Sequence, residues 1–286
     1  MEHGKCHKHG GMFYYNLNFN QAIGSWNTAK VTDMAYLFQN ATNFNQAIGS
    51  WNTANVTNMS HMFYSAQKFN QAIGSWNTAR VTNMAAIFYY TLNFNQVINL
   101  WYVQSVTDMN SMFNYSIFNT SIGGWSVSNV RDMSNMFYNS QFNSDLTPNF
   151  IATTTNVTSM QGMFGRSSFN KSLQNLNTSN VITMNSMFEG NVVFNNGFNA
   201  DIGGIYNYLN WNITNVRDMS YMFYGAKVFN SALNNFTLRI DCSYSAFNLN
   251  ARPQDRLDEY NSNRRPKVTT SNGVVIEMPQ SVFSSY

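Results

Sequence analysis

The stretch FNQAIGSWNTAKVTDMAYLF, residues 19–38, decides the fold, because edited copies of it return along the chain until about residue 238. Its first eleven residues recur unchanged at 44–54 and 69–79. The tryptophans Trp26, Trp51, Trp76 and Trp101 follow one another at intervals of 25 residues. A period in this range is typical of a solenoid, whose units cannot bury their apolar faces alone and therefore stack. The sequence predicts one elongated array of similar coils.

Each unit contains three recurring elements: a Phe-Asn pair, an Ile or Leu four residues after that Phe, and Val-x-x-Met-x-x-Met-Phe or a close variant. The apolar residues of segment 31–38 are spaced three, three and one apart, which favours a short helix with one apolar face. Thr32 is placed to cap this helix, and Asp33 lies near the positive end of its dipole. Residues 23–28 are the expected strand. We therefore expect an α/β solenoid of about nine coils, with short parallel strands on one side and short helical turns on the other.

The asparagine after each repeated phenylalanine falls at an equivalent place in every unit. Its side-chain amide can bond to backbone groups at a turn and to the coils above and below. We therefore predict a structural ladder, and not a ligand-binding row, made of Asn20, Asn45, Asn70, Asn95, Asn119, Asn143, Asn170, Asn199 and Asn230.

Charge and hydropathy narrow the class of partner. Charged residues make up 10% of the chain, well below the usual quarter, and 16 basic residues face 13 acidic ones. An array this close to neutral lacks the basic stripe that binding nucleic acid requires. No run of 18 apolar residues predicts membrane insertion, and the first residues have no apolar core of a signal peptide. The location is not fixed by these features, but they favour an intracellular or virion setting over secretion.

The code Phe-Asn-x-x-Ile-x-x-Trp followed by Val-Thr-x-Met-x-x-Met-Phe resembles the BspA-like leucine-rich-repeat family over residues 12–238. Repeats of this kind, about 25 residues long, occur in mycoplasma lipoproteins and in large DNA viruses. The resemblance implies a leucine-rich-repeat-like, right-handed superhelix used in adhesion or protein interaction. It brings no catalytic residues to carry over.

Two segments lie outside the array. Residues 1–11 form a polar tail whose His3, Cys6, His7 and His9 have metal-ligand chemistry, but their tight spacing fits no standard zinc pattern, so we expect no metal site. Residues 239–286 form a C-terminal cap or tail, with a hairpin expected near 267–278 because Asn272 and Gly273 lie between two β-branched runs.

Candidate binding residues lie where the repeat is interrupted. An insertion before Trp211 carries Tyr206, Tyr208 and Leu209, and insertions in repeat proteins often form loops on a binding face. The alternative is a tolerated insertion whose aromatic rings cover a gap. His61, the one histidine of the array, stands where other units have Tyr36, Ala86, Ser111 or Asn135, which is typical of a variable surface position.

No constellation of titratable groups for catalysis is apparent, so we expect no enzyme and no cofactor. The sequence favours a repeat protein that acts as a protein-interaction or structural scaffold. The specific version of this hypothesis is a capsid-associated component of a large DNA virus. Its partners would be other proteins, bound through the solenoid face and the C-terminal tail. The alternative is an adhesin-like module that recognises a host protein or glycan.

Overall fold

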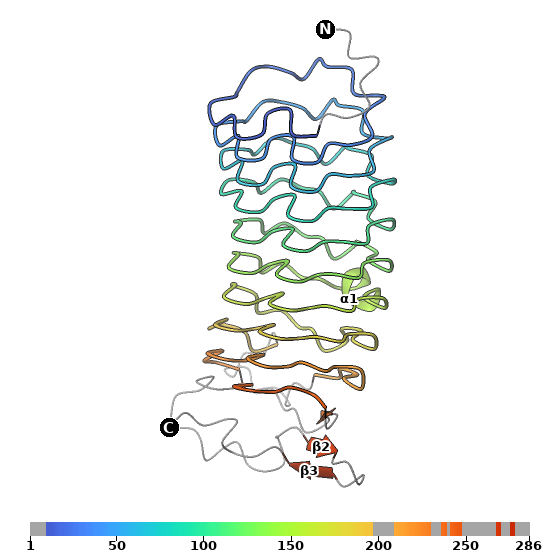
Figure 1. Cartoon of the computed structure of the whole chain (residues 1–286), viewed down its shortest axis with the longest axis vertical. Coiled ribbons are helices and arrows are strands. Elements are labelled where there is room, and N and C mark those ends of the chain that lie inside the picture. The colour runs from blue at the N-terminus through green and yellow to red at the C-terminus, as the bar shows by residue number, and fades with distance from the viewer. Residues whose placement is uncertain are drawn as a thin grey trace.

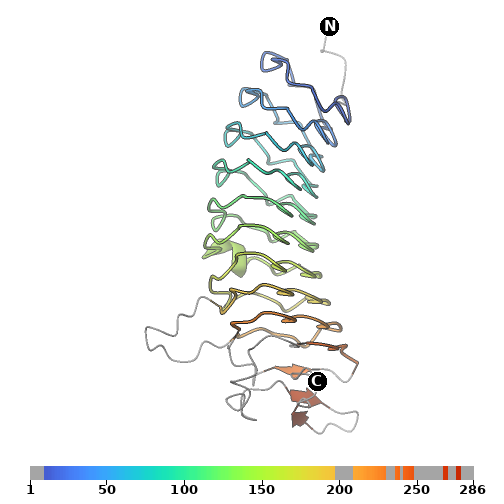
Figure 2. The same cartoon turned by 90° about the vertical axis from the view of Figure 1, so that its left-hand side faces the viewer.

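The structure is a computed structural model that describes residues 10–196, 209–229, 236–238, 241–247, 267–269 and 275–277. Within these residues there are one helix, α1 (Asn149–Ala152), and three strands, β1 (Thr237–Leu238), β2 (Lys267–Thr269) and β3 (Val275–Glu277). The rest of the described chain runs in turns and irregular segments. These segments form coils that follow one another along the long axis (Figure 1). Seen from the side, the coils form a regular stack (Figure 2).

Single-residue parallel bridges join each coil to the next. They run from Asp33 to Asn58, Asn83 and Asp108, and continue in the same way to Ser243. The first bridge is closed by two backbone hydrogen bonds, from the Met34 N–H to the Asn58 carbonyl at 2.9 Å and from the Thr57 N–H to the Thr32 carbonyl at 2.8 Å. Because each bridge joins equivalent positions, the sequence repeat becomes a spatial repeat.

The prediction of a helix at residues 31–38 is wrong, since these residues form turns and one bridge. The N–H groups of Met34, Tyr36 and Phe38 donate to carbonyls of the following coil, and Tyr36 has a φ of 59°, in the left-handed region. Asp33 accepts the Ala35 N–H at 3.0 Å in a local turn, so it has no helix dipole to stabilise. Every second N–H therefore points along the stack, a pattern that an α-helix cannot have because its N–H groups bond within the helix.

The strand predicted at residues 23–28 is also not formed, since the pairing between coils lies at the Asp33 position instead. The strand and helix sides of the predicted fold class are thus replaced by bridged turns. The leucine-rich-repeat geometry and the right hand of the superhelix stay predictions.

Phenylalanine rings fill the centre of the stack in two columns. In one column, Phe38 stacks on Phe63 at 5.7 Å between ring centroids, and in the other Phe44 stacks on Phe69 at 5.8 Å. The columns touch each other, with 3.8 Å between the rings of Phe38 and Phe44. All these rings are fully buried. Burial of a ring of this size contributes roughly 2–3 kcal/mol, so the columns are the main source of cohesion between coils.

The repeated tryptophans pack at the edge of this core and bond to the preceding coil. The indole N–H of Trp51 donates to the Ile23 carbonyl at 3.1 Å, and that of Trp76 donates to the Ile48 carbonyl at 3.2 Å. Each of these tryptophans thus gives a carbonyl of the preceding coil a hydrogen-bond donor and also fills space in the core.

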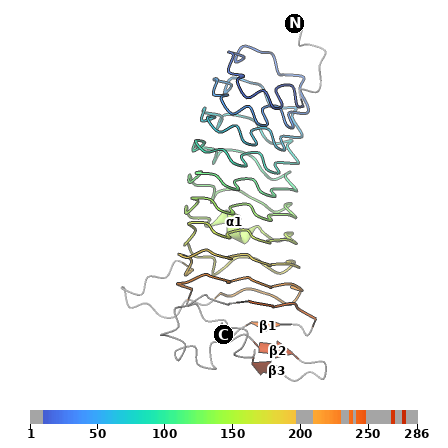
Figure 3. The ribbon, with the colours of Figure 1, turned by 60° about the vertical axis from the view of Figure 1, so that its left-hand side comes forward.

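The C-terminal strands lie beyond the last coils of the stack (Figure 3). β1 pairs in parallel with β2, and β2 pairs antiparallel with β3, with Val268 opposite Ile276. β2 and β3 occupy the two arms of the hairpin expected near 267–278, and the residues between them lie outside the described part of the chain.

Candidate functional site

One corner of the stack holds two left-handed residues in almost every coil. Coils are counted here from Gly11, so that the second, third and fourth begin at Tyr36, His61 and Ala86. In the second coil the two left-handed residues are Tyr36 and Asn40, each with a φ of 59°. A side chain in this conformation costs about 1–2 kcal/mol, which glycine avoids. The two equivalent series are Gly11, Tyr36, His61, Ala86, Ser111, Asn135, Gly162, Ser186, Tyr221 and Ala246, and Tyr15, Asn40, Ser65, Tyr90, Tyr115, Asn139, Arg166, Gly190 and Gly225. Because the strain recurs in coil after coil, it belongs to the fold and not to a single site.

Tyrosine side chains gather along this corner. We call the set the tyrosine stripe, and it consists of Tyr14, Tyr15, Tyr36, Tyr64, Tyr89, Tyr90, Tyr115 and Tyr138, with His61 among them. The His61 ring lies 4.7 Å from the Tyr36 ring and 5.7 Å from the Tyr64 ring. Tyr64 and Tyr89 stack at 4.4 Å with only 3° between their planes. The rings thus form a run of contacts from coil to coil.

An ion pair ends the stripe. The guanidinium of Arg166 lies 5.7 Å from the centre of the Tyr138 ring and donates to Glu189 at 3.1 Å. More than half of the Arg166 side chain is exposed, so this pair contributes at most about 1 kcal/mol. Burial raises the pKa of Tyr138 and that of Tyr89. Both phenols therefore stay protonated and neutral at physiological pH.

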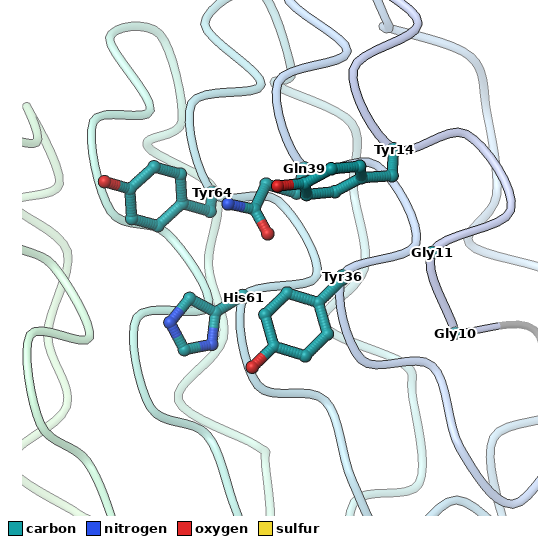
Figure 4. A pocket seen from close by; sticks show the side chains of 7 residues that line it. All are labelled: Gly10, Gly11, Tyr14, Tyr36, Gln39, His61 and Tyr64. Atoms are coloured by element: carbon teal, nitrogen blue, oxygen red, sulfur yellow. The ribbon is translucent and has the colours of Figure 1, made fainter.

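A groove of about 620 Å³ lies at the N-terminal end of the stripe. Its lining residues are Gly10, Gly11, Tyr14, Tyr36, Gln39, His61 and Tyr64 (Figure 4). Burial lowers the pKa of His61, while the carboxylate of Asp108 acts in the opposite direction. The imidazole is therefore neutral near pH 7 and has one acceptor nitrogen.

An apolar patch marks the fourth coil. Val97, Leu100 and Tyr102 are 61%, 73% and 60% exposed. The third coil has Ala72, Ser75 and Asn77 at these places. A hollow of about 510 Å³ next to the patch is lined by Leu100, Tyr102 and Trp76, among others. Two polar residues are replaced by Leu100 and Tyr102, and Ala72 by the larger Val97, which makes this a second candidate contact surface.

The predicted loop residues are not brought together as a site. Leu209 is fully buried in the core, so its side chain is not available to a partner, and its prediction as a binding residue is wrong. It was misassigned because the sequence places it in an insertion, whereas its side chain packs with the repeated core. Tyr206 and Tyr208 lie outside the described residues.

The repeated asparagines bond from coil to coil on another face. Asn20 Oδ1 accepts the Asn45 N–H at 2.9 Å and the Gln46 amide at 3.0 Å. Equivalent Oδ1 atoms accept the next N–H at Asn45, Asn70, Asn95, Asn119, Asn143 and Asn170. Through these bonds, the asparagine side chains link each coil to the next.

The ladder assignment of Asn199 needs a correction. The N–H group that donates to Asn170 Oδ1, at 2.7 Å, is that of Asn195. Phe194 likewise joins the phenylalanine column, stacking on Phe169 at 6.3 Å. Two Phe-Asn pairs stand four residues apart here, and the first keeps the 25-residue step. Asn199 and Asn230 lie outside the described residues.

The candidate ligands His3, Cys6, His7 and His9 also lie outside the described residues. Within the described ones, no group of three or more His, Cys, Asp or Glu side chains is placed to hold a metal ion. Cys242 is buried. In the same part of the chain, no helix has the length and apolar character needed to span a bilayer.

Sequence reasoning missed the tyrosine stripe, although a signal for it exists. Most of its members follow the Phe of Met-x-x-Met-Phe or its variants by one or two residues: Tyr14, Tyr15, Tyr64, Tyr89, Tyr90, Tyr115 and Tyr138. Aligning the residues after that Phe, and not only the apolar code before it, would have found the stripe.

A protein-family model described as "Mycoplasma protein of unknown function, DUF285" matches the chain three times, at residues 4–91, 71–164 and 151–258. No curated protein and no solved structure matches it. Three consecutive matches agree with the internal repeats, and the chain is a repeat protein.

Proposed function

Since the chain belongs to the DUF285 family of Mycoplasma proteins of unknown function, we propose that it is a non-enzymatic repeat protein that binds another protein through the tyrosine stripe. The observation that carries the proposal is the continuous run of ring contacts from Tyr36 through His61 and Tyr64 to Tyr89. Tyrosine is enriched in protein interfaces because its ring supplies a large apolar contact area and its hydroxyl finds a hydrogen-bond partner.

The chemistry of the stripe supports a protein partner. Tyr36, Tyr90 and Tyr115 are exposed. Since the pKa values of Tyr89 and Tyr138 are raised, the surface presents neutral hydroxyl groups. Rigid aromatic side chains lose little conformational entropy when they are buried against a partner. A neutral, aromatic, hydroxyl-bearing strip thus fits a polar and aromatic protein surface better than a charged polymer.

The contacts of His61 support a binding role over a catalytic one. A general base needs a second group that orients it and a place for a reacting atom. The imidazole is flanked by the rings of Tyr36 and Tyr64 instead.

We also propose that the chain is related to the BspA-like leucine-rich-repeat family, because it carries the repeated code Phe-Asn-x-x-Ile-x-x-Trp. The family description names Mycoplasma proteins and gives no support to a capsid-associated role, which stays a prediction.

The second candidate is an adhesin-like module for a host protein or glycan, and the apolar patch of Val97, Leu100 and Tyr102 favours it. A glycan stacks on exposed ring faces. In the stripe, Tyr64 and Tyr89 turn their faces toward each other at 4.4 Å, which leaves less face for a sugar. The stripe therefore favours a protein, and the patch is the place to test the adhesin alternative.

The test compares two double variants of the full chain. Tyr90→Ser with Tyr115→Ser empties the middle of the stripe and copies the residue that Ser65 already provides at the same left-handed position. Leu100→Ser with Tyr102→Asn restores the residues of the third coil and serves as the matched control. The partner is captured from Mycoplasma extract, identified, purified and titrated against each chain.

We expect the stripe variant to lose roughly tenfold or more in affinity, the range for removal of interface aromatic residues, and the patch variant to keep its affinity. Equal affinity of the stripe variant and the unchanged chain would refute the proposal. Loss of affinity in the patch variant alone would assign the function to the fourth coil.

A further inference from the structure

The N-terminal end of the stack, at the top of Figure 1, leaves part of its core exposed. Met12 is 45% exposed, whereas Leu37, at the same place in the second coil, is fully buried. Phe13 and Phe19 are only partly buried, whereas every later ring of the two phenylalanine columns in the described part of the chain is fully buried. A terminal unit of a repeat array normally has a polar outer face. This end is apolar instead.

The backbone at this end has unused acceptors. Within the stack, the Phe38 N–H donates to the Met62 carbonyl at 2.9 Å, and the residues two before and two after pair in the same way. The corresponding carbonyls at the N-terminal end, to which no described residue donates, are those of Gly10, Met12 and Tyr14. All three residues are exposed. A row of unpaired backbone groups of this kind is a template for pairing with another chain.

The asparagine ladder also has an unused group here. The Asn45 N–H donates to Asn20 Oδ1, and the Asn70 N–H donates to Asn45 Oδ1. The Asn20 N–H is the first of this series, and no described residue accepts it. The end therefore offers three acceptors and one donor, in the pattern that each coil offers to the coil before it.

Three occupants of this end can be compared. Residues 1–9 contain no Phe, Tyr or Trp, so they supply no ring for the columns. A second copy that approaches with its own N-terminal end offers three more acceptors and one donor. A second copy that approaches with its C-terminal end carries β2 and β3 beyond its last coils (Figure 3). A coil of another repeat protein supplies both the rings and the N–H groups.

We propose that this end binds the last coil of a second repeat protein of the same family, which continues the stack. The bound segment has two Phe six residues apart and an Asn directly after the second, as residues 38–45 have here. Its alternate N–H groups donate to the three free carbonyls, and its rings stack on Phe13 and Phe19. Adding an extended segment to an exposed edge is a known mode of recognition. The contact lies on the axis of the stack and the tyrosine stripe along its side, so the inference does not depend on the proposed function.

The experiment titrates the full chain with a synthetic peptide of residues 36–45, YLFQNATNFN, blocked at both ends. This segment stacks on a following coil in the structure, with N–H donors at Tyr36, Phe38 and Asn40. We expect saturable binding in ligand-observed NMR, with a Kd on the order of 1 mM or tighter. A peptide with Ser in place of both Phe residues should not bind, because it has no rings for the columns.

Two ester peptides test the direction of stacking. An ester oxygen in place of the Phe38 N–H removes a donor that faces the chain, and should weaken binding by roughly fivefold. The matched control has the ester at Asn43, whose N–H donates to the preceding coil at the Leu17 carbonyl, at 3.2 Å. In the bound peptide this N–H faces away from the chain, so the control should keep its affinity. The chain is unchanged in both titrations, so misfolding cannot produce the difference.

A pair of chain variants locates the peptide. Met12→Asp places a carboxylate on the apolar end and should weaken binding by roughly tenfold or more, as for loss of a central contact. Met12→Leu copies Leu37 of the second coil and should keep the affinity. No saturable binding, equal affinities of the two ester peptides, or equal affinities of the two variants would overturn the proposal. A dimer of the unchanged chain that Met12→Asp dissociates in sedimentation would also overturn it, because the occupant would be a second copy.

Discussion

Asn191 is the buried polar residue whose removal tests our account of the stack most directly. Its side chain is fully buried and makes five hydrogen bonds. Its Nδ2 donates to the carbonyls of Phe164 and Phe169 and to the hydroxyl of Ser167, at 3.1–3.2 Å. Its Oδ1 accepts the N–H groups of Val193 and Phe194 at 3.1 and 3.0 Å. The amide therefore ties two neighbouring coils together.

Other coils show what alanine does at this position. Ala66 stands there in the third coil, and its carbonyl accepts the Phe69 N–H at 3.0 Å. In Asn191→Ala, the Phe194 N–H can find the same kind of partner, but the Phe169 carbonyl loses its donor inside the core. The Nδ2 group has two hydrogens, so its three contacts count as two bonds. These two bonds and the one from the Val193 N–H are lost, and at about 1 kcal/mol for each we expect a loss of about 3 kcal/mol in the free energy of unfolding.

The matched control is Ser140→Ala, at the equivalent position. The Ser140 hydroxyl donates to the Phe137 carbonyl at 2.8 Å and accepts the Phe142 N–H at 3.3 Å. Its removal should cost about 1 kcal/mol. Urea unfolding followed by tryptophan fluorescence measures both variants. Hydrogen exchange at the Phe194 amide shows whether the loss is local, because coils in an array need not unfold together.

If Asn191→Ala is no less stable than Ser140→Ala, the reasoning is wrong. In that case the phenylalanine columns would hold the two coils together without the amide.

Three further predictions concern the corner, the histidine and the patch. Gly225→Ala should cost about 1 kcal/mol, since Gly225 has a φ of 69° and the added Cβ would have only an ordinary contact at 3.6 Å; an unchanged urea midpoint would contradict this. Because burial lowers the pKa of His61, the unfolded chain takes up this proton first, and stability should fall as the pH drops below 6.5. His61→Gln should remove that part of the acid sensitivity in thermal unfolding, whereas the raised pKa of Asp108 works in the opposite direction, adding stability at low pH that is lost as the pH rises through the folded pKa. Leu100→Ser with Tyr102→Asn should change the melting temperature by no more than the equivalent of about 0.5 kcal/mol, and a larger loss would mean that the patch packs on the fold.

The core could be predicted from the sequence because a fixed period repeats each contact. Once Phe38 and Phe63 hold equivalent places, their rings must lie one above the other, and the same holds for Asn20 and Asn45. Where two copies of a motif compete, local sequence does not decide between them. Phe194 was chosen over the next Phe-Asn pair by the 25-residue step to its neighbours in the stack.

The backbone path could not be predicted in this way. A spacing of three, three and one suits a short helix and also suits a series of turns. The adjacent coil selects the turns over the helix, because its carbonyls accept the N–H groups of Met34, Tyr36 and Phe38. Those bonds exist only when the coils are stacked, so no single unit encodes them.

The sequence by itself determined the repeat, its period, the apolar residues of the core and the asparagine positions that bond between coils. Only the tertiary structure decided that residues 31–38 are bridged turns, and only it brought the tyrosines together. Two left-handed residues in each coil direct the side chains of that corner outward, and their φ angles follow from the need to bond every second N–H to the next coil. The candidate binding surface is therefore a consequence of how the coils stack.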